Sequence, residues 1–199
     1  MKTFLNVGCG TRSKANTTAA FAGEDWQELR LDINEAVRPD IVGTMTDMKA
    51  VADESVDAVF SSHNIEHLYA HEVPVALHEF LRVLKADGFA VITCPDLQSV
   101  AALVAEDKLV EPAYTSPAGP ITPLDMIYGH RPQVAAGDLF MAHRCGFTRK
   151  VLGGTLLSCG FKSVFTSRRP AFFDLWALAS KSAIAEADIR KLAGEHIPN

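Results

Sequence analysis

Two glycines and an aspartate near the start of the chain have the types and spacing of a small-molecule binding site. Gly8 and Gly10 follow the apolar run Phe4–Val7, and Asp32 ends a second predicted short strand about twenty residues later. Glycine lets the main chain turn sharply and approach a ligand that a Cβ atom would hold away. A carboxylate is an acceptor only, so Asp32 can bind both hydroxyl groups of a ribose. The combination predicts a nucleotide-type ligand.

A second group of candidate residues follows the predicted strand at 56–62. His63 and His67 come after it, and histidine is the usual proton acceptor near neutral pH. With Glu66 they also match His-x-x-Glu-His, the inverted zinc-peptidase motif, which requires both histidines on one continuous helix. Because His63 follows the strand directly, we expect it to precede the helix, and we assign no metal ligand.

The elements that must position these residues alternate between strand and helix. Strands are predicted at 4–7, 28–31, 40–45, 56–62 and 89–94, and apolar residues at helical spacing predict a helix over 73–84. Asp96 can cap a further helix, whose inner face would carry Leu97, Val100, Ala101 and Val104. This alternation indicates a parallel sheet with helices on both faces.

Ligands of such sheets bind beyond the carboxyl ends of the strands, near the point where the strand order reverses. Gly8, Asp32, Asp47 and Ser62 all lie at predicted strand ends. We therefore expect these four residues, which are far apart in the sequence, to surround one ligand.

Prolines and glycines interrupt the alternation from residue 109 to 147. A stretch of this length in a compact domain is typical of a lid or a binding loop. We expect a lid-like insert that faces the substrate, with candidate contacts at Tyr128, His130, Arg131 and His143. A helix over 148–160 and two antiparallel strands, 161–168 and 172–180, are predicted to follow, and the charged tail from 183 is predicted to be peripheral.

Composition excludes several classes of protein. The chain has 199 residues, 48% of them hydrophobic, and a formal net charge of −5, which does not suit nucleic-acid binding. Its four cysteines form no Cys-x-x-Cys pair, as expected of reduced thiols. Since it has neither a membrane span nor a signal peptide pattern, we expect one cytoplasmic domain over 1–199. The oligomeric state stays open, with a homodimer as one alternative.

The chain resembles the class I S-adenosylmethionine-dependent methyltransferases of the type 11 branch. The resemblance rests on segments in the family's order and spacing: Leu5–Gly10, Leu31–Ile33, Thr46–Met48, Ser55–Val59 running into His63–Leu68, and Arg82–Gly88. It implies a Rossmann-like doubly wound α/β fold with a seven-stranded sheet, mostly parallel with an antiparallel last strand. It also implies methyl transfer from S-adenosylmethionine to a small-molecule acceptor, with S-adenosylhomocysteine as the product.

The resemblance also implies roles for individual residues. The cofactor-binding set is Val7, Gly8, Cys9 and Gly10 under the methionine part, Asp32 and Ile33 at the ribose, Asp47 and Met48 at the adenine, and Ser62 and His63 beside the sulfonium. His67 and His63 are the candidate proton acceptors for a hydroxyl substrate. The third glycine common in the family's first loop is absent, because Thr11-Arg12-Ser13 stands in its place.

Three other functions stay open from the sequence. A nicotinamide-dependent (NAD) oxidoreductase would use the same first strand and Asp32, although Ser13 occupies the last glycine position of its usual motif. A zinc metallopeptidase would use His63, Glu66 and His67. A non-catalytic cofactor-binding partner subunit would keep the fold without the chemistry.

Overall fold

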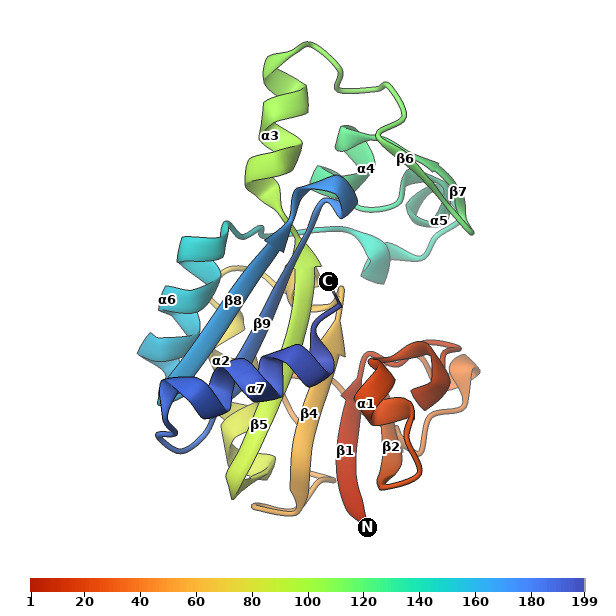
Figure 1. Cartoon of the computed structure of the whole chain (residues 1–199). Coiled ribbons are helices and arrows are strands. Elements are labelled where there is room, and N and C mark those ends of the chain that lie inside the picture. Colours follow the sequence, from red (N-terminus) through yellow and green to blue (C-terminus); the bar gives the residue numbers. More distant parts are fainter. Residues whose placement is uncertain (199) are drawn as a thin grey trace.

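The computed structural model describes residues 1–198, and a large sheet forms its centre (Figure 1). Within that range the sheet has seven strands in the order β3-β2-β1-β4-β5-β9-β8. Their bounds are β1 Lys2–Val7, β2 Trp26–Asp32, β3 Ile41–Val42, β4 Val56–Ser62, β5 Leu84–Pro95, β8 Ser163–Arg169 and β9 Asp174–Ser180. The first five are parallel, whereas β9 is antiparallel to β5 and β8. The predicted fold class is confirmed.

Helices cover both faces of this sheet (Figure 1). The α-helices are α1 Ala19–Ala22, α2 Val73–Val83, α3 Leu97–Ala105, α4 Pro123–Tyr128, α5 Arg131–Ala135, α6 Arg149–Cys159 and α7 Glu186–His196. Single 3-10 turns occur at Lys14–Asn16, Glu35–Val37, Ile65–His67, Leu139–Met141 and Pro170–Phe172. A small hairpin, β6 Tyr114–Ser116 and β7 Gly119–Ile121, lies in the insert.

The strands bury both faces because successive side chains of a strand point to opposite sides of the sheet. Leu5 of β1 joins the core under α2 and α6, whereas its neighbour Phe4 joins the core under α1 and α7. Strands buried on both faces read as continuous apolar runs, which is how the sequence presents β1, β4 and β5. Their parallel pairing then sets the common edge at which the candidate site residues lie.

The C-terminal segment covers one face of the sheet. The prediction from the sequence that this tail is peripheral is therefore wrong. Helix α7 buries Ile189, Ala193 and His196 against that face. The His196 ring lies 4.3 Å from the Phe21 ring, and its Nδ1 is 3.0 Å from Thr18 Oγ1. Because most residues of this helix are polar or charged, and most of these face outward, the composition of the tail does not reveal its few apolar contacts.

Helix α3 also differs from its prediction. Asp96 caps it as expected, since its carboxylate accepts the Gln98 N–H. Val100 is buried, but Ala101 and Val104 are exposed, because α3 projects beyond the sheet and packs on α4 (Figure 1). Strand β3 is likewise shorter than predicted.

In residues 1–198, no helix combines the length and the apolar character that a membrane crossing requires.

We predict that protonation of His196 destabilises the fold. Burial, together with the charge of Lys2, lowers the pKa of His196 to about 4. The free energy of unfolding is therefore highest above the unfolded pKa of about 6.5, where His196 is neutral in both states. It falls by about 2–3 kcal/mol as the pH decreases towards 4, because the unfolded chain takes up the proton first. Urea unfolding at pH 7 and pH 4.5 should show a smaller loss for His196→Phe than for the wild type. Equal losses would contradict the assignment.

Candidate functional site

The carboxyl ends of β1, β2, β4 and β5 meet at one edge of the sheet. The register places Val7 beside both Leu31 and Ser61, and Ser62 beside Thr93. The strand order reverses between β1 and β4, because the chain continues to β2 on one side and to β5 on the other. In open parallel sheets the crevice at such a reversal is the ligand site. The segments after these strands therefore form the candidate site.

The loop after β1 and the end of β2 form one hydrogen-bonded unit. Gly8 and Gly10 have φ angles of 66° and 54°, in the region that favours glycine. The Gly8 N–H donates to the Leu31 carbonyl at 2.8 Å, and the Gly10 N–H donates to Asp32 Oδ2 at 2.7 Å. The sharp turn predicted at the two glycines is therefore present, and its hydrogen bond to Asp32 is a contact that the sequence did not predict.

The two glycines serve different neighbours. A Cβ at Gly8 would lie 2.1 Å from Asn64 Oδ1, whereas nothing in the described chain lies within 4 Å of a Cβ at Gly10. The Asn64 amide donates to the carbonyls of Val7 and Ser62, at 2.9 and 3.0 Å, and so joins the ends of β1 and β4. Gly8 therefore makes room for Asn64, and Gly10 leaves open space for a ligand. No motif in the sequence singled out Asn64.

Asp32 keeps capacity for further hydrogen bonds. It is buried, and its second oxygen accepts the Asn34 N–H at 2.8 Å. A carboxylate has about four lone-pair sites, so the two bonds that it makes within the described residues leave two sites for a ligand. Arg30, which sequence reasoning missed, donates to the Gly10 carbonyl at 2.7 Å and steadies the same loop.

Burial distinguishes the other predicted cofactor contacts. Ile33 and Asp47 are exposed, and Lys49, whose Nζ is 2.9 Å from the Asp47 carboxylate, lowers the pKa of Asp47. Met48 is buried in the core, its N–H donates to Glu79 and its carbonyl accepts from Arg82. The backbone groups of Met48 are therefore engaged with α2.

Cys9 is a packing residue rather than a nucleophile. Its side chain is buried, and burial raises the pKa of its thiol. A thiol needs its thiolate form to attack a substrate, so a raised pKa keeps Cys9 unreactive.

His63 and Glu66 form a pair directly after β4. His63 lies before the 3-10 turn Ile65–His67, with a φ of 54°, and its Nδ1 is 3.4 Å from Glu66 Oε1. The continuous helix that the zinc-peptidase motif requires does not form here, as expected. Glu66 raises the pKa of His63, whose side chain is about half exposed. Burial opposes the charge of Glu66, but His63 and the neighbouring histidines outweigh it and lower the pKa of Glu66. Ser62 Oγ lies 3.0 Å from Thr93 Oγ1.

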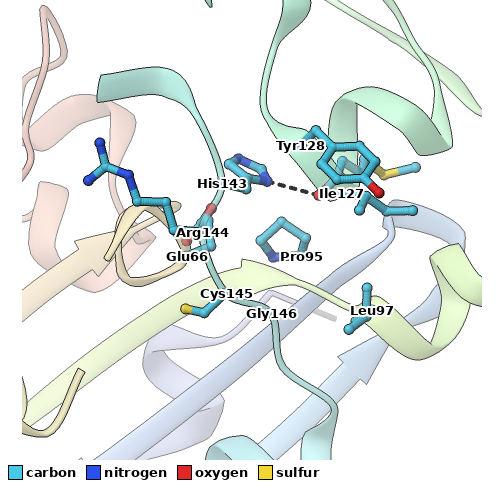
Figure 2. A pocket seen from close by; sticks show the side chains of 10 residues that line it. Glu66, Pro95, Leu97, Ile127, Tyr128, His143, Arg144, Cys145 and Gly146 are labelled. Carbon is cyan, nitrogen blue, oxygen red and sulfur yellow. Dashed lines mark hydrogen bonds between the residues drawn. The ribbon is translucent and has the colours of Figure 1, made fainter. Parts of the chain in front are cut away.

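A pocket of about 230 Å³ opens between the end of β5 and the insert (Figure 2). Its walls come from Glu66, from Pro95 and Leu97 between β5 and α3, from Met126 to Tyr128 of α4, and from residues 143–146. The sequence singled out Glu66 only within the zinc-peptidase alternative, whereas the structure places it in both the pocket wall and the His63 pair. The pocket thus adjoins the strand ends that carry the other candidate residues.

Backbone hydrogen bonds hold the end of the insert against this edge. The Arg144 and Cys145 N–H groups donate to the Glu66 carbonyl at 2.8 and 3.2 Å, and the His143 N–H donates to the Tyr128 carbonyl. His143 is half-buried, and burial lowers its pKa, which favours the neutral imidazole. The insert therefore covers the ends of β4 and β5, and its movement as a lid stays a prediction.

The structure brings two of the four predicted substrate residues into the pocket. Tyr128 and His143 line it, whereas His130 and Arg131 lie outside its walls. The Arg131 Nε donates to Asp125 Oδ1 at 2.7 Å. Burial would raise the pKa of Asp125, but Arg131 and Thr122 hold it well below its usual range. Arg131 thus stabilises the start of α4, and His130 Nδ1 lies 2.9 Å from Gln133 Oε1 on α5.

Comparison with known proteins gives one family match. Residues 5–92 match the family model described as Methyltransferase domain, which covers β1 to most of β5. The match includes Gly8, Asp32, Asp47 and His63. A search of curated proteins finds no match.

Solved structures share the fold at low sequence identity. A SAM-dependent methyltransferase from Archaeoglobus fulgidus is 16% identical, with a TM-score of 0.58 over 90% of this chain and 86% of that one. The 1,6-didemethyltoxoflavin-N1-methyltransferase of Burkholderia thailandensis, solved with 1,6-didemethyltoxoflavin and S-adenosylhomocysteine, is 15% identical, with a TM-score of 0.57 over 92% and 72%. The PH0226 protein of Pyrococcus horikoshii is 14% identical, with a TM-score of 0.62 over 90% and 81%.

We predict that Gly8→Ala destabilises the chain more than Gly10→Ala does. Both variants place an alanine at a positive φ, which costs about 1–2 kcal/mol. Gly8→Ala must in addition displace Asn64 and its hydrogen bonds, for a total near 3 kcal/mol. Urea unfolding of the two variants gives the comparison directly, and an equal loss in both would show that Asn64 does not depend on Gly8.

Proposed function

We propose that this chain, which belongs to the class I S-adenosylmethionine-dependent methyltransferases of the type 11 branch, methylates a small-molecule acceptor held beneath its insert. The observation that carries the proposal is the adjacency of two features at one sheet edge. An open glycine loop bonded to Asp32 lies on one side of the strand reversal, and the His63–Glu66 pair with its pocket lies on the other.

The residues of the glycine loop fit the cofactor, S-adenosylmethionine. The space over Gly10 accepts a group that a Cβ would exclude, and Asp32 has two acceptor sites left for the ribose hydroxyls. The exposed Asp47 carboxylate has one oxygen facing Lys49 and keeps the other for the adenine amino group. Ile33 and Ser62 are the proposed neighbouring contacts, and Val7, Cys9 and Met48, whose side chains are buried, would line the site only with main-chain atoms. When bound, this cofactor supplies a methyl group already activated on a sulfonium.

The chain therefore needs mainly to align the acceptor with the methyl carbon and to exclude water. Such positioning supplies roughly 7–11 kcal/mol of the barrier reduction in favourable cases. The pocket has apolar walls at Pro95, Leu97 and Ile127, and the Tyr128 ring stands at its rim (Figure 2). Its volume of about 230 Å³ lies below the roughly 300–1,000 Å³ of typical ligand pockets, which limits the acceptor to a compact molecule. In the Burkholderia thailandensis neighbour the second bound molecule is 1,6-didemethyltoxoflavin, which supports this class of acceptor.

For a hydroxyl acceptor, we assign the proton to His63. Its Nδ1 lies 3.4 Å from Glu66 Oε1, an ion-pair contact through which the buried carboxylate would stabilise the imidazolium that forms when the ring takes up a proton. The acceptor proton would pass to Nε2 of His63 as the oxygen forms its bond to the methyl carbon. His67, the other candidate, instead has its Nδ1 3.2 Å from the Ala142 carbonyl oxygen, so the partner of that nitrogen is a neutral carbonyl group rather than a carboxylate.

We predict that the wild-type chain binds S-adenosylhomocysteine and that Asp32→Asn binds it about 10–100-fold more weakly. The reason is the loss of a charged acceptor for the ribose, since hydrogen bonds to charged groups contribute about 1.5–3 kcal/mol. Titration calorimetry measures both affinities. Asp87→Asn, an exposed change at the opposite edge of the sheet, is the matched control. Binding of NAD in place of S-adenosylhomocysteine would overturn the proposal in favour of an oxidoreductase.

We predict that His63→Asn lowers turnover about 100-fold or more with a hydroxyl acceptor, because general-base catalysis contributes about 10²–10⁴-fold. Release of S-adenosylhomocysteine across a panel of small acceptors gives the rate. The exposed His71→Asn should keep the wild-type rate. Unchanged turnover in His63→Asn, with cofactor affinity intact, would remove His63 as the base.

A further inference from the structure

Three side chains that could bind a metal ion converge between the turn after β4 and the end of the insert. They are Glu66, His67 and His143, and one potential ligand atom of each lies within 4.8 Å of those of the other two. The two imidazole rings lie edge to face, with their centres 4.9 Å apart. Glu66 and His143 also line the pocket (Figure 2). The cluster therefore stands at the pocket wall.

The hydrogen bonds of the two histidines leave the same ring atom available. His67 Nδ1 is 3.2 Å from the Ala142 carbonyl oxygen, and His143 Nδ1 is 2.8 Å from that of Met126, a bond drawn in Figure 2. A carbonyl oxygen can only accept, so each Nδ1 carries the proton and each neutral ring keeps its lone pair at Nε2. Histidines that bind metals in proteins are held in this way, with the other ring nitrogen donating to a carbonyl or carboxylate.

The Glu66 carboxylate lacks the partners that its burial requires. Its side chain is 1% exposed, and neither oxygen accepts a hydrogen bond from any residue of the range 1–198. His63 Nδ1 lies 3.4 Å from Oε1 and belongs to a side chain that is 47% exposed. Buried carboxylates are normally paired, hydrogen-bonded or bound to a metal. A cation between Glu66 and the two imidazoles would meet this requirement.

We propose that Glu66, His67 and His143 bind a divalent first-row transition metal ion, of which Zn²⁺ is the representative. Two neutral imidazoles and one carboxylate are a donor set that such ions accept, and three protein ligands leave a coordination position open. An oxygen or nitrogen atom of the methyl acceptor would fill that position from the pocket. This last role rests on the proposed function, whereas binding of the ion does not.

The site differs from the zinc-peptidase motif in its ligands. The motif would use His63 and His67 as its two histidine ligands. In the proposed site His63 is not a ligand, and His143, which the insert brings from far along the sequence, joins His67 and Glu66. Its approach depends on the hydrogen bonds that hold Arg144 and Cys145 to the Glu66 carbonyl. A ligand set of this kind has no contiguous pattern in the sequence.

The test uses the full chain after treatment with a chelator. Titration with Co²⁺, followed by visible absorption, and with Zn²⁺, followed by calorimetry, should each show one ion per chain. Glu66→Gln and His143→Ala should each weaken binding by about 10-fold or more. His71→Ala and His78→Ala remove exposed imidazoles and should bind as the wild type does.

Two results would overturn the inference: absence of ion binding by the wild type, or equal binding by the wild type and His143→Ala. A loss confined to Cys145→Ser would overturn it as well, because a thiol would then be the ligand. If the buried Glu66→Gln variant does not fold, as thermal unfolding would show, the half-buried His143→Ala decides the question.

Titration of the same wild-type samples with S-adenosylhomocysteine separates the two proposals. Normal binding of that ligand without metal binding would reject the metal site alone. Metal binding without binding of S-adenosylhomocysteine would reject the proposed methyl transfer and would still support the metal site.

Discussion

Strand β1 pairs with β4 in parallel, with Val7 beside Ser61, and the rest of the candidate site depends on this pairing. It sets the ends of the two strands side by side, so the glycine loop after β1 and the His63 turn after β4 begin next to each other at one edge of the sheet. The Asn64 amide reinforces the junction through the carbonyls of Val7 and Ser62. Gly8 must lack a Cβ for that amide to fit. Hydrogen bonds within the protein therefore hold the two strand ends together at this edge.

Glu66, in the turn after β4, connects this edge of the sheet to the insert through both its backbone and its side chain. Its carbonyl accepts two N–H groups from the segment that carries His143, which closes the pocket over the end of β5. Its carboxylate lies 3.4 Å from His63 Nδ1 and within 4.8 Å of a ring nitrogen of both His67 and His143. A single buried charge thus links the strand reversal, the pocket wall and the insert. A change at Glu66 would affect all three regions together.

The basic residues of the insert show that charge alone does not identify a binding residue. Arg131 neutralises Asp125 at the start of α4, and the Arg144 guanidinium lies 4.8 Å from the centre of the Tyr69 ring. Both contacts stabilise the insert as a structure. In Figure 2 the Arg144 side chain points away from the pocket, while the His143 ring stands over it. The pocket is lined instead by apolar residues and by Glu66 and His143.

The amino-acid sequence determined the local features of this protein. Apolar runs on both faces specified the parallel strands, and Gly8, Gly10 and Asp32 specified the loop that joins β1 to β2, because these depend on side-chain periodicity and on backbone conformation. Tertiary structure alone decided the rest. Whether Ala101 and Val104 are exposed, whether α7 covers the sheet, and which of Arg131 and His143 reaches the pocket depend on packing between distant segments. The approach of His143 to Glu66 is of the same kind, since it arises from hydrogen bonds between segments that no spacing in the sequence relates.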